Sequence, residues 1–136
     1  MKRLFAVLAV TVCLFGMSQP ALAASQKGSG EVVVYNWSDY IPEDVLKDFT
    51  KETGIKVVYS TYESNEAMIA KIKLLKGKTY DVVCPSTYFI PQMIADGLLA
   101  ELDHSKLPNL AQMDPRLMNQ SFDPQNKYSV PYMWGN

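Results

Sequence analysis

Three short apolar runs, each followed by a stretch with helical spacing, constrain the fold of this chain most strongly. The runs cover residues 31–36, 55–59 and 80–84, and each contains adjacent valines. Continuous apolar runs are typical of strands that are buried on both faces of a parallel sheet. Strand–helix–strand units join such strands through right-handed crossovers. The sequence therefore predicts an α/β fold with a parallel or mixed sheet flanked by helices.

The connecting stretches carry helix start and stop signals. Pro42 suits the first turn of one helix, and Gly54 suits the position just after its end. Ser64 or Asn65 can cap a second helix, which Gly77 ends. A third short helix is expected over residues 89–96, and the chain beyond residue 103 is expected to be rich in loops. The predicted inward-facing side chains are Val45, Leu46 and Phe49 in the first helix and Met68, Ile69, Ile72 and Leu75 in the second.

The first 23 residues have the layout of a secretory signal peptide. Lys2 and Arg3 precede an apolar run over residues 4–15, and a small residue at Ala21 and at Ala23 marks a cleavage site. We expect cleavage after Ala23, a flexible leader over 24–30 and a folded part over 31–136. The alternatives are an uncleaved membrane anchor and a lipoprotein signal, the latter disfavoured because Cys13 lies inside the apolar run.

Charge and cysteine content narrow the functional class. After removal of the signal peptide, 11 basic and 14 acidic side chains remain, so the net charge is −3. This balance argues against nucleic-acid and anionic-membrane partners and suits a cationic ligand. Cys84 remains as the single cysteine, so the exported chain must fold through its core without an internal disulfide.

Aromatic and polar side chains follow two of the predicted strands. Trp37, Ser38, Asp39 and Tyr40 follow the first strand, and residues 86–88, Ser-Thr-Tyr, follow the third. Ligands of open α/β sheets bind outside the carboxyl ends of strands. Aromatic faces attract cations, and a carboxylate hydrogen-bonds an amine. The pattern predicts a site for an apolar stem with charged amino ends; in the alternative, Trp37 is a core residue and Asp39 caps the next helix.

An enzymatic function is the rival hypothesis. A secreted hydrolase or transferase would use Cys84 as its nucleophile, and such a thiol needs an activating neighbour. The single histidine, His104, lies in a predicted loop and cannot build a zinc site alone. We therefore expect no enzyme activity, no metal and no cofactor.

Several segments together resemble the bacterial periplasmic spermidine/putrescine-binding proteins, the soluble receptors of polyamine ABC importers. They cover residues 33–42, 49–57, 59–66, 80–88 and 123–135, in that order, and the resemblance spans residues 31–136. It implies a two-lobed fold of the type II periplasmic binding class, which closes on its ligand like a hinge. Because no capping helix or polar tail follows the expected strand that enters Trp134-Gly135-Asn136, we expect an N-terminal fragment that holds most of the first lobe.

The resemblance also implies a ligand set and partners. The family's polyamine contacts fall on Trp37, Ser38, Asp39, Tyr40, Ser86 and Tyr88 of this chain. The remaining contacts would lie beyond residue 136. We expect a monomeric periplasmic receptor that delivers spermidine, with putrescine as a second ligand, to a membrane permease. The same fold serving another solute stays open as an alternative.

Overall fold

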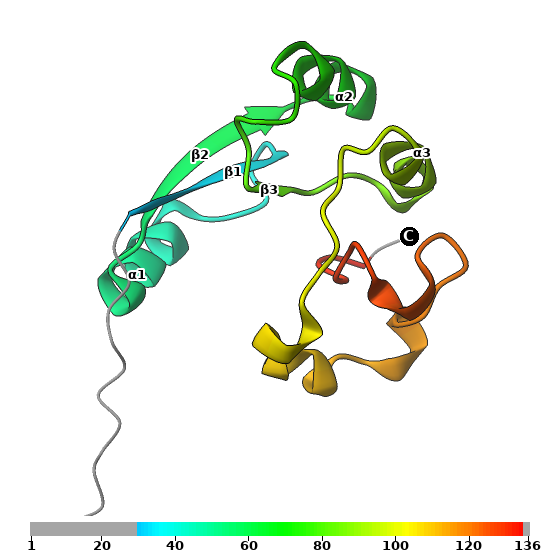
Figure 1. Cartoon of the computed structure of the whole chain (residues 1–136). Helices are drawn as coiled ribbons and strands as arrows, with labels where there is room; N and C mark the ends of the chain where they lie inside the picture. The colour runs from blue at the N-terminus through cyan, green and yellow to red at the C-terminus, as the bar shows by residue number, and fades with distance from the viewer. Residues whose placement is uncertain (1–29, 135–136) are drawn as a thin grey trace, which may run out of the picture.

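The computed structural model describes residues 30–134, which form a small parallel sheet with helices on both faces (Figure 1). The strands are β1 (Glu31–Trp37), β2 (Lys56–Tyr62) and β3 (Val82–Val83). They pair in the order β2-β1-β3, and both pairings are parallel. The helices are α1 (Glu43–Thr53), α2 (Asn65–Leu74) and α3 (Ile90–Ala95). The predicted α/β class with a parallel sheet is confirmed.

The strand lengths differ from those predicted. The second strand extends past its predicted end at residue 59, because the ladder with β1 continues through Ser60 and Thr61 to the pair Trp37↔Tyr62. Pairing with a long central strand thus holds polar residues in extended form. In contrast, β3 is only two residues long, because it pairs with β1 only at Val34 and Tyr35. The valines of β1 are half-buried, so the predicted burial on both faces is wrong for them.

The core lies between α2 and the sheet face that carries Tyr35 and Tyr62. Met68 and Met93 are fully buried there. Three of the four predicted inward-facing residues of α2, Met68, Ile69 and Ile72, are buried. The fourth, Leu75, follows the last helical residue and is exposed, so its prediction is wrong. The buried cluster comprises Tyr35, Tyr62, Met68, Ile69, Ile72 and Met93.

Helix α1 covers the opposite face of the sheet only loosely. The predicted inner stripe is wrong in part, because Val45 and Phe49 are exposed and no residue of α1 is buried. The crossover from β1 to β2 and the crossover from β2 to β3 run in opposite directions across the sheet, so right-handed connections place α1 and α2 on opposite faces. Within residues 30–134, few side chains pack against the apolar stripe of α1, so the stripe stays exposed.

Capping residues set the helix ends mostly as expected. Ser64 caps α2, and its Oγ accepts a hydrogen bond from the Ala67 amide at 3.2 Å. Gly54 ends α1 in the left-handed conformation, with φ 80°. Pro42 is the residue before α1 rather than part of its first turn. The predicted third helix is split into a 3-10 turn, Thr87–Phe89, and α3.

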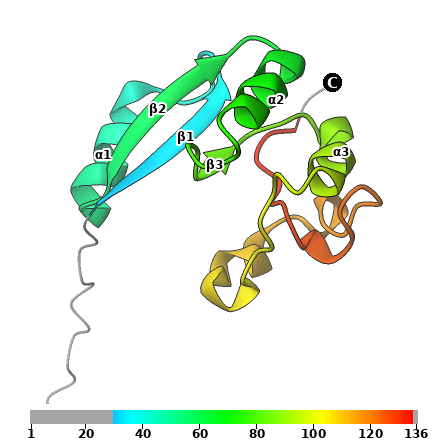
Figure 2. The same cartoon turned by 45° about the horizontal axis from the view of Figure 1, so that its top comes forward.

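Beyond residue 103 the chain forms short 3-10 turns and no strand up to residue 134, which confirms the predicted loop-rich character. The buried Asp123 carboxylate organises this region by accepting hydrogen bonds from the amides of Lys127, Tyr128 and Ser129. In Figure 2 the red segment after these turns runs back towards the sheet. There the Tyr132 hydroxyl donates a hydrogen bond to the Tyr40 carbonyl, in the loop that follows β1.

The predicted signal peptide, its cleavage after Ala23 and nearly all of the leader lie outside the described residues. None of the helices within residues 30–134 has the length and apolar character that a membrane span requires.

Candidate ligand-binding site

Four aromatic rings gather at the carboxyl ends of β1 and β2. The register Trp37↔Tyr62 puts these two side chains on neighbouring strands, with ring centroids 4.6 Å apart. Tyr40 lies 6.2 Å from the Trp37 ring, and Tyr132 lies 6.4 Å from the Tyr40 ring. The Tyr132 hydroxyl also donates to the Tyr40 carbonyl at 3.1 Å. Trp37 is half-buried and Tyr40 exposed, so the cluster packs on the core while part of its surface faces solvent.

The loop after β1 is tied to the segment after β2 through a hydroxyl–carboxylate contact. The Ser38 Oγ donates to Glu63 Oε1 at 2.7 Å. Asp39 has φ 61°, in the left-handed region that aspartate tolerates better than most residues. This turn follows the end of the strand and leaves the Asp39 side chain exposed. Two carboxylates, Asp39 and Glu63, therefore lie beside the aromatic cluster on adjacent loops.

The loop after β3 is tied to the start of α2 by the buried Asn65. Its Nδ2 donates to Ser86 Oγ at 3.0 Å and to Tyr88 Oη at 3.2 Å. Its Oδ1 accepts from the Ser86 amide at 3.0 Å. These three bonds fix the orientation of the amide and hold the two hydroxyls, while the Tyr88 ring remains 72% exposed.

The residues after β2 thus link the two predicted clusters, Glu63 on one side and Asn65 on the other. Sequence reasoning placed Trp37 to Tyr40 and Ser86 to Tyr88 at the same edge, and all three strands indeed end there. It did not select Glu63, Asn65 or Tyr132. For Glu63 and Asn65, the sequence signal that could have identified them is their position in the polar stretch 60–66, between a strand and a helix.

The geometry around Cys84 does not suit a nucleophile. Burial raises the pKa of the Cys84 thiol, which disfavours the reactive thiolate. The only histidine points elsewhere, with its Nε2 2.8 Å from the Asn126 carbonyl oxygen. Among residues 30–134, no group of three or more histidine, cysteine, aspartate or glutamate side chains is arranged to hold a metal ion.

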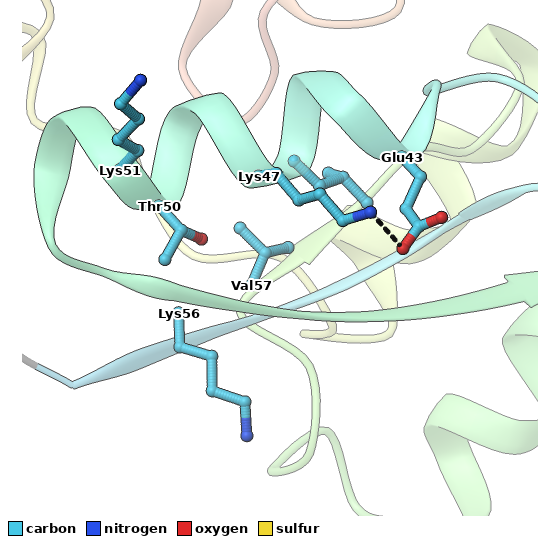
Figure 3. Close-up of a pocket in the computed structure, with 7 residues that line it drawn as sticks. Glu43, Lys47, Thr50, Lys51, Lys56 and Val57 are labelled. Atoms are coloured by element: carbon cyan, nitrogen blue, oxygen red, sulfur yellow. Dashed lines mark ion pairs between the residues drawn. The ribbon is translucent and has the colours of Figure 1, made fainter.

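A concavity lies away from the aromatic cluster, between α1 and the amino end of β2 (Figure 3). It is a shallow groove of about 400 Å³ with Leu46 and Val57 in its apolar lining. Three lysines surround it, Lys47, Lys51 and Lys56, and Lys47 pairs with Glu43 at 2.9 Å. Clustered ammonium groups repel a polycation, so this groove does not suit an amine ligand.

The comparisons with known proteins decide the family. Residues 36–136 match the family model described as bacterial extracellular solute-binding protein. The chain belongs to this family. It is 49% identical over 129 residues to the spermidine/putrescine-binding periplasmic protein of Salmonella typhimurium, covering 95% of this chain. It is 47% identical to the putrescine-binding periplasmic protein SpuD of Pseudomonas aeruginosa, covering 99% of this chain.

Solved structures agree with this assignment. The spermidine/putrescine ABC transporter substrate-binding protein PotD of Streptococcus pneumoniae aligns with a TM-score of 0.74 and 51% identity, over 79% of this chain and 33% of that chain. The chain spans about a third of the length of its relatives, namely 36% of each of the two curated proteins above. The fold is therefore that of polyamine-binding periplasmic proteins of the type II-like class, whose names denote binding components of transporters rather than enzymes.

Proposed function

We propose that this chain is the N-terminal part, most of the first lobe, of a periplasmic receptor that binds spermidine or putrescine for an ABC importer. The observation that carries the proposal is the aromatic and acidic cluster at the carboxyl ends of β1 and β2, in a chain close to polyamine-binding relatives. The proposed ligand contacts are Trp37, Ser38, Asp39, Tyr40, Ser86 and Tyr88.

The chemistry of a polyamine matches this arrangement. Its ammonium groups are hydrogen-bond donors only, and they need carboxylate, hydroxyl or carbonyl oxygens. Its methylene stem is apolar and gains from burial against rings such as Trp37 and Tyr40. A cation over an aromatic face adds about 0.5–2 kcal/mol. Asp39 supplies the negative charge that a neutral aromatic cluster lacks.

The proposal extends to the location and partners of the complete protein. The signal-like residues 1–23 and the periplasmic relatives support export, with cleavage after Ala23. A second lobe would close over the ligand and exclude water from the charges. The closed monomer would then present its surface to a membrane permease.

Isothermal titration calorimetry of the complete protein with spermidine and putrescine tests the proposal. We expect saturable binding to both ligands, together with a rise in melting temperature. Competition with amino acids and iron chelates separates a polyamine receptor from the same fold serving another solute. An absence of heat and of thermal shift at millimolar polyamine would contradict the assignment.

A further inference from the structure

The direction of one hydroxyl proton carries an inference about how the site recognises an amine. A serine hydroxyl has one proton to donate and two lone pairs that accept. An ammonium group offers donors only. A hydroxyl whose proton is already directed to another acceptor therefore presents only its lone pairs to an amine ligand.

Ser38 meets this condition. Its Oγ donates to Glu63 Oε1 at 2.7 Å, which leaves the oxygen lone pairs available. An ionised carboxylate accepts and never donates, so this contact allows one direction only. The pairing follows from the strand register, because Ser38 and Glu63 each come one residue after the pair Trp37↔Tyr62.

The hydroxyls after β3 are arranged in the opposite sense. Ser86 Oγ and Tyr88 Oη both accept from Asn65 Nδ2, so their protons remain available for donation. Only the β1 side of the site thus has a hydroxyl whose proton is engaged by a carboxylate. Glu63 forms no ion pair with another residue of the stretch 30–134, so this carboxylate is not neutralised by a lysine or arginine there.

We propose that Glu63 is a positioning residue that orients the Ser38 hydroxyl as an acceptor for a ligand ammonium group. This inference rests on the proposed function and adds a residue to it. Glu63 acts through Ser38 rather than by touching the ligand, which separates its role from that of Asp39.

Glu63→Gln in the complete protein tests the proposal, with Glu66→Gln as the matched control. Glutamine keeps the size of the side chain, but its amide can donate to Ser38 and reverse the hydroxyl. Glu66 is exposed in the first turn of α2, so its substitution removes the same charge nearby. We expect putrescine affinity to fall about tenfold or more in Glu63→Gln, as for loss of a charge-assisted hydrogen bond. The control should stay within about twofold.

A double-mutant cycle with Ser38→Ala separates this role from a general structural one. In the Ser38→Ala background, Glu63→Gln should cause no further loss of affinity, because the hydroxyl it orients is gone. An equal loss in both backgrounds, or a Glu63→Gln affinity that matches the Glu66→Gln control, would overturn the inference while the proposed function stands. An unsubstituted protein that does not bind putrescine or spermidine would overturn both.

Discussion

At the scale of single residues, the site is built from side chains that also support the fold. Trp37 packs against the buried Tyr62, and Tyr59 donates to the Trp37 carbonyl at 3.2 Å. Asn65 is buried and holds two hydroxyls of the neighbouring loop. A substitution in this region therefore affects either binding alone or binding together with stability, and each variant needs both measurements.

Replacing Trp37 tests the aromatic part of the site. Trp37→Ala in the complete protein should weaken polyamine binding by about 1–3 kcal/mol, because stacking and burial of the methylene stem are lost. Calorimetric titration measures the change. Phe49→Ala, an exposed aromatic residue of α1 on the opposite face, serves as the control. An unchanged affinity in Trp37→Ala would assign the indole to the core.

Tyr88 offers a cleaner separation of binding from folding. Its ring is 72% exposed and its hydroxyl is held by Asn65. Tyr88→Ala should weaken the free energy of polyamine binding by more than it lowers the free energy of unfolding of the ligand-free protein. Tyr88→Phe, compared with it, isolates the contribution of the hydroxyl. Equal losses of affinity and stability would indicate a structural residue.

Burial of Cys84 and Tyr62 predicts a stability loss at alkaline pH. Burial raises the pKa of the Cys84 thiol and of the Tyr62 phenol above their ordinary values. The unfolded chain then loses these protons at lower pH than the folded chain does. The Cys84 contribution is present below the ordinary thiol pKa of about 8.5 and is lost as pH rises above it, and the Tyr62 contribution is lost in the same way above the ordinary phenol pKa of about 10.

Urea unfolding at pH 7 and pH 10 measures this effect. We expect a lower free energy of unfolding at pH 10, and a smaller pH dependence in Cys84→Ala. Identical pH dependence in the two proteins would show that the thiol is not the titrating group.

At the scale of elements, α2 is the helix that joins core and site. Its N-terminal cap, Ser64, lies between Glu63 and Asn65, so the helix start sets the direction of both side chains. Met68, Ile69 and Ile72 anchor the same helix on the sheet. The position of the site therefore depends on where α2 begins.

Ser64→Ala tests this dependence. Loss of the bond from the Ala67 amide should lower the free energy of unfolding by about 0.5–2 kcal/mol. Ser64→Asp, which restores an acceptor, should recover most of the loss. Chemical denaturation of the complete protein checks both variants; equal destabilisation by alanine and aspartate would argue against the cap.

Sequence patterns predicted the elements better than their ends and their burial. The strand–helix order and the α2 stripe were predictable, since apolar spacing decides them. The extension of β2 through Ser60 and Thr61 was not, because pairing with β1 decides it. Tyr132 was not predictable as a neighbour of Tyr40, because local sequence carries no information about a contact 92 residues away. The assigned ligand contacts stay predictions until binding is measured.

At the scale of the whole molecule, much apolar surface remains exposed between residues 30 and 134. Leu74 is 80% exposed and Trp134 is 78% exposed, and the stripe of α1 is open as well. The outer edge of the two-residue β3 pairs with no further strand within this range. Hydrophobic burial is the main stabilising term in small domains, so the segment is poorly stabilised by its own contacts.

We accordingly expect residues 24–136, produced alone, to be marginally stable. Circular dichroism during heating should show a broad, weakly cooperative transition, and the complete protein should show a sharp one. A sharp cooperative melt of the isolated segment would contradict this expectation.

The bond between the Tyr132 hydroxyl and the Tyr40 carbonyl has a consequence for the order in which contacts form during folding. The parallel pair β1–β2 needs only residues 31–62, whereas this hydrogen bond joins residues that lie 92 positions apart in the chain. The fourth ring can join the aromatic cluster only after the late loops have closed across the intervening chain, which is a slow, entropically costly step. The aromatic cluster is therefore completed later in folding than the strand pair on which it rests.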